Sequence, residues 1–334
     1  MGAMPGEGLS TAADAAVMIR FAAVRLIEIA ALLALMSFVI YGLIGLMPGD
    51  PIDLMRSADP RMTAEDVARL KAVYGVDRPL LARYLGWAGQ ALGGELGYSR
   101  LFAAPVAAAL LPRLGNSLLL MGSSFVLALA LALALGTIAA RHAGSRLDSA
   151  INLFCFAGVS VPTFWLALVL ILVFAAGLGW LPASGVATAG AGDFADRLRH
   201  LVLPVATLTV ASVGGYTRYV RAAMREALAQ DHIRTARAKG ASEARIVFRH
   251  AMRSALIPVT TIIALSFGGL VSGALVTETM FAYPGMGKLI FDAVMGNDYN
   301  LALAALLLAA ITAMLANLAA DLAYAWLDPR VSYR

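Results

Sequence analysis

Six long apolar runs restrict the fold of this chain more than any other feature of its sequence. They lie near residues 24–47, 116–140, 150–176, 201–220, 256–277 and 301–325. A helix needs about 20 residues to cross the hydrocarbon core of a bilayer, which is about 30 Å thick. Each run is long enough, and a helix satisfies its own backbone hydrogen bonds without water. We therefore predict an all-α integral membrane protein with six transmembrane helices.

The composition agrees with this prediction. Of the 334 residues, 60% are hydrophobic and 14% are charged, whereas soluble domains are about 45–50% apolar and about 25% charged. The chain has a net charge of +5, and its basic residues cluster in the loops between apolar runs. This distribution indicates that the basic residues set the membrane topology rather than bind nucleic acid. The single cysteine, Cys155, has no second cysteine with which to form a disulfide or a cysteine-based metal site.

The distribution of basic residues predicts the topology. Arg20 and Arg25 lie at the start of the first run, Arg141 and Arg146 follow the second, and a basic stretch at 218–253 begins at the end of the fourth. Basic residues mark cytoplasmic loops, so we expect both termini in the cytoplasm.

The segments outside the runs complete the expected organisation. Residues 1–17 are small and polar and are expected to be a disordered tail, leaving 18–334 as one membrane domain. Residues 48–115 then form an external insertion, in which glycines and prolines punctuate short helices rather than strands. This insertion suits either a surface that meets a substrate-delivering protein or a structural plug.

The basic stretch between residues 218 and 258 is the most distinctive polar segment. At about 2.5–3.5 kcal/mol for each Arg or Lys at the bilayer centre, it cannot lie in the membrane. Its pattern predicts a short helix that ends with Gly240 at the C′ position, followed by a second helix capped by Ser242. Ile233, Ala236, Arg237 and Gly240 would share a face of mostly small side chains. Such a helix suits docking of a soluble partner, although an ordinary cytoplasmic loop has a similar composition.

The amino-acid sequence of this stretch resembles that of a known protein family. Residues 231–242 read DHIRTARAKGAS and residues 249–258 read RHAMRSALIP. Both resemble the cytoplasmic loop of ABC importer permeases of the dipeptide/oligopeptide/nickel branch, with mild departures at His232, Ile233, Ala241 and Ser254. The wider superfamily has the pattern EAA-x3-G, and Arg234, Thr235, Ala236 and Gly240 keep its register.

Further stretches extend the resemblance to nearly everything after Met18. They are PGDP at 48–51, GELGYS at 94–99, VPTFWL at 161–166, ETMFAYPGMG at 278–287 and LDPRV at 327–331. The resemblance implies the type I ABC importer permease fold, with 48–115 as an extracytoplasmic helical insertion and 221–250 as a cytoplasmic coupling loop.

The resemblance also implies a function and an assembly. The chain would be the first-permease, B-type subunit of an ATP-driven importer for dipeptides or oligopeptides in the bacterial cytoplasmic membrane. Its partners would be a second homologous permease, two ABC ATPase subunits, an extracytoplasmic substrate-binding protein and membrane lipid. The chain contains no phosphate-binding loop, so ATP and Mg are expected on the ATPase subunits, with no cofactor or metal and no catalytic residue here.

The expected contact with the ATPase is the coupling helix and the turn that follows it. Its residues are Asp231, His232, Ile233, Arg234, Thr235, Ala236, Arg237, Ala238, Lys239, Gly240, Ala241 and Ser242. Import of nickel or another small solute by the same scaffold stays open as an alternative. So does a different class, an autonomous carrier, a channel or a membrane enzyme, although such a protein would need charged groups inside its apolar runs.

Overall fold

A computed structural model of the chain describes residues 7–46, 63, 65, 79–190, 192–267 and 273–327. The side chains of 7–22, 261–267 and 320–327 are not described. The expected stretch at 48–51, most of the one at 327–331 and much of the insertion at 48–115 therefore lie outside the described residues.

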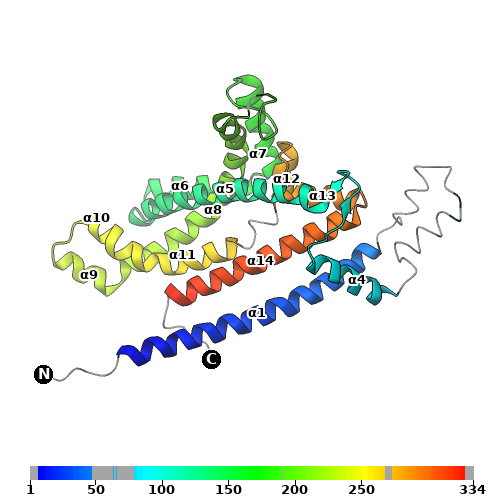
Figure 1. Ribbon diagram of the computed structural model, residues 1–334. Helices are drawn as coiled ribbons and strands as arrows, with labels where there is room; N and C mark the ends of the chain where they lie inside the picture. The colour runs from blue at the N-terminus through cyan, green and yellow to red at the C-terminus, as the bar shows by residue number, and fades with distance from the viewer. Residues whose placement is uncertain are drawn as a thin grey trace. The chain divides into compact units, whose positions relative to one another are not determined.

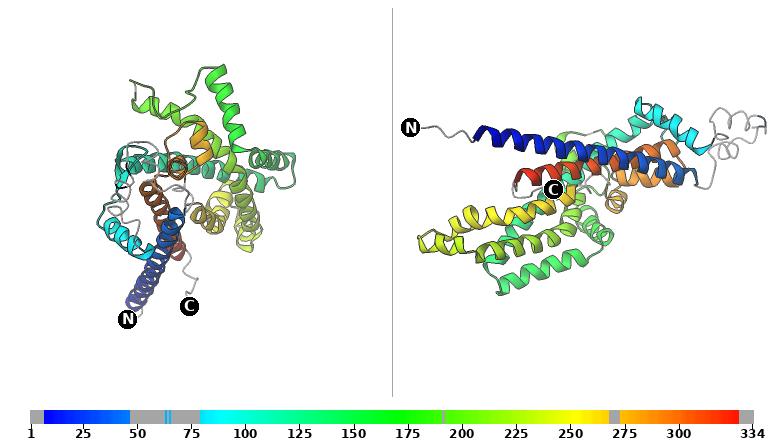
Figure 2. Two further views of the ribbon diagram at one scale, coloured as in Figure 1. Left: turned by 90° about the vertical axis from the view of Figure 1, so that its right-hand side faces the viewer. Right: turned by 90° about the horizontal axis from the view of Figure 1, so that it is seen from below.

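Helices make up almost all of the described chain (Figures 1 and 2), so the all-α prediction is confirmed. In chain order they are α1 (Glu7–Gly45), α4 (Leu80–Leu92), α5 (Val106–Arg141), α6 (Arg146–Ser160), α7 (Thr163–Leu170), the π-helix η1 (Ile171–Gly177), α8 (Phe194–Ala229), α9 (Asp231–Ala238), α10 (Glu243–Arg245), the π-helix η2 (Ile246–Ala251), α11 (Met252–Phe267), α12 (Leu275–Met280), α13 (Met286–Met295) and α14 (Tyr299–Leu327).

The described residues contain four helices that are long and apolar enough to cross a membrane, or up to five if one bent pair counts as a single span. The four include segments of α1, α5, α8 and α14, which contain the expected first, second, fourth and sixth runs. The expected fifth run begins in α11, which reaches the edge of a described range at Phe267. The protein is thus a multi-pass membrane protein, and the count of six crossings remains a prediction.

The third expected run differs from the prediction because it is broken. α6 ends at Ser160, α7 begins at Thr163, and the two parts of the run are bent by 100°. Val161 has extended backbone angles, φ −80° and ψ 125°. The ring of Pro162 disfavours the helical region for the residue before it, so the break falls where the sequence places this proline.

The expected tail also needs correction, because α1 begins at Glu7. Residues 7–17 were expected to be disordered but are helical. The segment AADAA at 12–16 is rich in alanine, the residue with the highest helix propensity, and it runs into an apolar span that continues the helix.

The outer segment contains one feature that was not predicted, a short hairpin after α4. β1 (Tyr98–Ser99) pairs with β2 (Ala104–Pro105) in antiparallel register, with Ser99 opposite Ala104. The buried Ser99 hydroxyl donates to Asp298 at 2.6 Å, and Asp298 also accepts from the backbone N–H of Leu301 at the start of α14. A serine–aspartate bond thus fixes the hairpin, and strands were missed because each has only two residues.

The chain divides into two compact units, one with residues 1–111, 289–314 and 332–334 and the other with 112–288 and 315–331. The core of the second unit has contributions from α5, α8, α9, η2 and α11, including Val213, Met224, Ile233, Ile246 and Val259. This core includes Ile233, a residue of the basic segment that the sequence singled out.

Helices α6 and α8 pack with their backbones almost in contact within the second unit. A Cβ added at Gly214 of α8 would lie 2.3 Å from the carbonyl oxygen of Cys155 in α6. A Cβ added at Gly158 of α6 would lie 2.9 Å from the carbonyl oxygen of Val210 in α8. Small residues allow this approach, as is common between membrane helices.

Candidate functional site

A short helix, α9, occupies the place of the predicted coupling helix, and it follows α8 almost directly. α8 ends at Ala229 and α9 begins at Asp231, so one residue, Gln230, separates them. Gln230 has extended backbone angles, φ −71° and ψ 152°, which turn the chain from one helix into the next. Figure 1 shows α9 and α10 at the end of the segment formed by α8 and α11.

The end of α9 matches the sequence prediction in detail. Gly240 has φ +78°, in the left-handed region. The N–H of Gly240 donates to the carbonyl of Arg237 at 2.9 Å, and the N–H of Ala241 donates to that of Ala236 at 3.1 Å. This pair of bonds is the Schellman motif, in which glycine at C′ satisfies carbonyls that the helix leaves unpaired.

The turn after Gly240 is fixed by a cap and an ion pair. Ser242 has extended angles, and its hydroxyl accepts from the N–H of Arg245 at 3.4 Å, so its predicted N-cap position is confirmed. Arg237 donates through Nε to Glu243 at 3.0 Å, which closes the turn from the other side. The bond from Arg237 lowers the pKa of the Glu243 carboxyl. The pair is therefore present above the ordinary carboxyl pKa and weakens as the pH falls through the lowered pKa.

Ile233 attaches α9 to the rest of its unit. Its side chain is fully buried, in a cluster that includes Met224 of α8 and Ile246 and Val247 of η2. Ala236, one helical turn later, is half-buried against the same cluster. The face that was expected to offer small side chains to a partner is thus divided. Ile233 and Ala236 pack inward, because they are apolar, whereas Arg237 and Gly240 are exposed.

The remaining residues of the expected contact lie together on the outside of this helix and turn. Ala241 is half-buried, and those that are exposed are Asp231, His232, Arg234, Thr235, Arg237, Ala238, Lys239, Gly240 and Ser242. Asp231 accepts from Arg234 across one turn of α9. The structure therefore brings the predicted residues into one surface, except that Ile233 is inaccessible.

An ion pair that the sequence reasoning missed lies beside this site, between α6 and α8. Arg221 donates through Nε and Nη2 to the two carboxylate oxygens of Asp148, at 2.7 and 2.6 Å. Asp148 is buried and also accepts from the N–H of Gly144 and the side-chain amide of Asn152. A two-bond arginine–carboxylate pair fixes both distance and orientation. It therefore holds the start of α6 against α8 close to where α8 leads into α9.

We expect Asp148→Asn to destabilise the protein by about 2–3 kcal/mol, because the amide would place its own N–H groups against those of Arg221. Thermal unfolding of the purified chain in detergent measures this loss. Arg225→Gln is the matched control, since Arg225 is exposed one turn further along α8. Equal unfolding temperatures for both variants would show that the ion pair does not hold α6 to α8.

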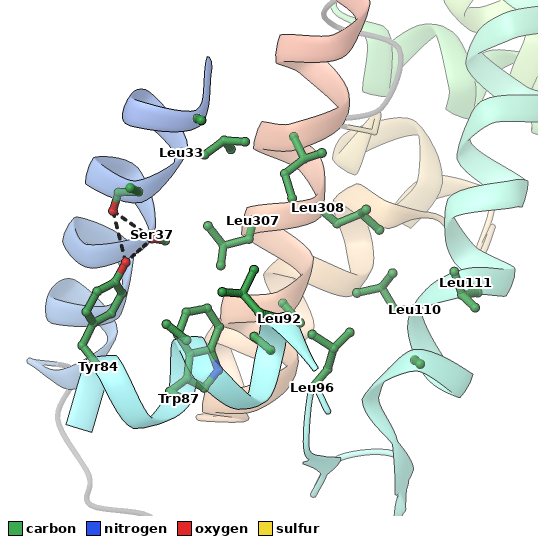
Figure 3. A pocket seen from close by; sticks show the side chains of 17 residues that line it. Leu33, Ser37, Tyr84, Trp87, Leu92, Leu96, Leu110, Leu111, Leu307 and Leu308 are labelled. Carbon is green, nitrogen blue, oxygen red and sulfur yellow. Dashed lines mark hydrogen bonds between the residues drawn. The ribbon is translucent and has the colours of Figure 1, made fainter. Parts of the chain in front are cut away.

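A separate pocket within the first unit is apolar (Figure 3). It has a volume of about 540 Å³, and its walls come from α1, α4, the first turns of α5 and α14. Its lining contains no Asp, Glu, Lys, Arg or His. The hydroxyls of Ser37 and Tyr84, which both line it, bond to each other at 2.7 Å. Such a surface suits apolar contact rather than recognition of a charged solute.

Known proteins resemble this chain over the segment that contains α9 and the turn after it. Residues 132–333 match the family described as "Binding-protein-dependent transport system inner membrane component". The chain belongs to this family. The match covers α9 and the turn after it, so the candidate site of this permease family member falls inside the shared region.

Curated relatives of this permease align over nearly its whole length. The oligopeptide transport system permease protein AppB of Bacillus subtilis is 39% identical, over 90% of this chain and 94% of its own. The di/tripeptide transport system permease protein DppB of Pseudomonas aeruginosa is 38% identical, over 88% and 93%. The glutathione transport system permease protein GsiC of Escherichia coli K12 is 34% identical, over 95% and 100%.

A solved structure confirms the fold of this permease. An inward-facing structure of the MetNI methionine ABC transporter aligns with a TM-score of 0.56 at 18% identity, covering 67% of this chain and 98% of that chain. At this identity the likeness concerns the fold, which supports the type I permease architecture expected from the sequence.

Proposed function

We propose that this chain is a permease subunit of an ATP-driven ABC importer that takes up dipeptides or oligopeptides. The curated relatives are named as permeases of oligopeptide, di/tripeptide and glutathione transport systems, and they align along nearly the full chain. In this function the chain forms part of the translocation path. It has no catalytic role, and ATP and Mg act on the partner subunits.

The proposed assembly follows the family. The chain pairs with a second homologous permease, binds two ABC ATPase subunits on the cytoplasmic side and receives solute from an extracytoplasmic binding protein. It resides in the bacterial cytoplasmic membrane with both termini inside the cell. Residues 231–242 form the contact with an ATPase subunit.

The single observation that supports this contact most is the construction of α9. Its inner face is attached to the core through Ile233, whereas the surface around it is polar and exposed. A helix held in this way follows the motion of whatever binds its exposed surface, because rigid packing transmits displacement. Closure of the ATPase subunits on ATP would thereby shift α8 between inward- and outward-facing states.

We expect Gly240→Asp to uncouple ATP hydrolysis from uptake without preventing membrane insertion. Aspartate and asparagine both tolerate left-handed backbone angles, so the expected cause is the negative charge that the new carboxylate adds to the proposed contact. No atom lies within 4 Å of a Cβ placed at Gly240, so steric collision is not the cause. Peptide uptake and ATPase activity in proteoliposomes measure the effect.

Gly240→Asn is the matched control, because asparagine tolerates left-handed angles and carries no charge. It should retain more than half of the uptake. Uptake by Gly240→Asp at the level of the parent protein would count against the role of this turn.

The function as a whole is tested by purification and transport. The tagged chain, co-expressed with its partner genes, should carry ATPase subunits with it, and the complex should accumulate a labelled di- or tripeptide only with ATP present. Accumulation of nickel and not peptide would favour the alternative cargo. Transport by the purified chain alone would favour an autonomous carrier.

A further inference from the structure

A basic hollow lies beside α9 on the exposed side of the helix–turn. It has a volume of about 400 Å³, and the side chains that give it its charge are His232 of α9, Lys239 directly after α9, Arg245 of α10 and His250 of η2. No acidic residue lines it. Three consecutive elements of one compact unit therefore direct basic or titratable groups toward the same space.

The acidic residues nearest to this hollow are already paired with other arginines. Asp231 accepts from Arg234, and Glu243 accepts from Arg237. Within the described part of the chain, neither Lys239 nor Arg245 forms an ion pair. The hollow therefore has uncompensated positive charge that a negative group from outside the chain would neutralise.

If α8 crosses the membrane along its normal, the part of the helix beyond its apolar run separates this hollow from the lipid headgroups. Arg218 is the first basic residue after the apolar run of α8, and the helix continues to Ala229. At 1.5 Å per residue, this part of the helix is about 16 Å long. The headgroup layer on each side of a bilayer is only about 5–8 Å thick. The source of the negative group is thus a soluble protein rather than a phospholipid.

We infer that the hollow receives the carboxylate side chain of an aspartate or glutamate on the bound ATPase subunit. This inference rests on the proposed function and adds to it the chemistry of the contact. Lys239 and Arg245 attract the carboxylate, and His232 and His250 supply N–H donors on either side. Because Lys239 adjoins Gly240, the end of α9 that carries the contact is the end that the Schellman motif fixes.

A zero-length cross-link tests the contact directly. A carbodiimide joins a lysine amine to a carboxylate as an amide, with no spacer, only where the two groups touch. In the intact complex, mass spectrometry should identify an amide between Lys239 and one aspartate or glutamate of an ATPase subunit. Lys239→Arg should abolish this cross-link while the complex still assembles, because the charge is kept and the amine is lost.

Charge reversal provides a second, independent measurement. The double variant Lys239→Glu, Arg245→Glu should weaken ATPase binding by about tenfold or more, since like charges would then face each other. Reversing the cross-linked acid on the ATPase to lysine should restore binding, which a misfolded variant could not do. Arg249→Glu is the control, because Arg249 is exposed on η2 outside the hollow and should bind ATPase normally.

The outcomes separate this inference from the proposed function. If the parent chain carries ATPase subunits with it but Lys239 cross-links to no ATPase acid, or the double variant binds ATPase normally, the inference is wrong and the function stands. If the double variant loses bound anionic phospholipid instead of ATPase, the inference is equally overturned. If the parent chain binds no ATPase under any condition, both are wrong.

Discussion

Gly214→Ala should lower the unfolding temperature of the purified protein by about 5–10 °C and reduce its yield from membranes. The new methyl group would lie 2.3 Å from the carbonyl oxygen of Cys155 and 2.9 Å from a methyl group of Val159. The nearest of these atoms belongs to backbone, which cannot rotate away, so α6 and α8 must separate. Overpacking of this kind costs about 1–3 kcal/mol and occasionally more, and about 2–4 °C accompany each kcal/mol in a chain of this size.

Gly215→Ala provides a control on the adjacent position of the same helix. No atom lies within 4 Å of a Cβ placed there, and alanine has a higher helix propensity than glycine by about 1 kcal/mol. This variant should unfold at the parent temperature or slightly above it. Unfolding of both variants at the same temperature would contradict the close packing of α6 on α8.

Glu278→Ala should produce the largest loss of stability among the single substitutions considered, about 3–6 kcal/mol. Glu278 has no exposed surface. Its Oε1 accepts from the hydroxyl of Ser117 at 2.8 Å and the N–H of Ala274 at 3.2 Å, and its Oε2 accepts from the N–H of Lys288 at 2.8 Å. Removing the carboxylate takes the acceptor from one buried donor, the Ser117 hydroxyl, and from two half-buried backbone N–H groups, and each buried donor left unsatisfied costs about 1–3 kcal/mol.

The surroundings of Glu278 fit a carboxylate closely. A Cβ placed at Gly285 would lie 2.2 Å from Oε1, so glycine leaves the space that the carboxylate occupies. The hydroxyl of Ser117 accepts from the N–H of Met286 at 2.7 Å, which extends the network to the start of α13. Burial, together with the charge of Glu278, raises the pKa of Tyr283 to about 12. Tyr283 therefore stays protonated and donates to the carbonyl of Asn116.

Thermal unfolding and peptide uptake of Glu278→Ala, Glu278→Gln and Glu95→Ala test this network. Glu278→Gln keeps the shape and one acceptor oxygen, so it should fall between the parent and Glu278→Ala. Glu95 is exposed, and its replacement should change stability by less than about 0.5 kcal/mol. A loss for Glu278→Ala no larger than that for Glu95→Ala would show that these hydrogen bonds are not formed.

The parts of the fold that local sequence rules govern were predictable. Long apolar runs indicated membrane helices, and Gly240 and Ser242 indicated the end of one cytoplasmic helix and the start of the next. Each depends on residues within one or two turns, which is the range of hydropathy and capping rules. The break at Val161 could also have been predicted, because Pro162 disfavours helical backbone angles at the residue before it. It was not predicted, because the run at 150–176 is long enough to be a single span.

Features that depend on distant parts of the chain were not predictable. The partner of Asp148 is 73 residues away in Arg221, and that of Glu278 is 161 residues away in Ser117. Asp148 stands alone among basic residues, and Glu278 is followed by a Pro-Gly-x-Gly sequence. Both features could have drawn attention to these acids, but neither feature specifies the hydrogen-bond partner. The direction in which Ile233 points was likewise not predicted. A polar helix of eight residues does not show by itself which side chain is buried, because Ile233 is buried by Met224 and Ile246, which lie on other elements.

The one-residue junction at Gln230 has a consequence for how the proposed transport cycle can be observed. With no linker to absorb torsion and with Ile233 preventing separation, α9 and the cytoplasmic half of α8 must keep a constant mutual distance. Paired spin labels on these two helices should give one narrow distance distribution, with and without nucleotide. A single label on α9 would then report the rotation of α8.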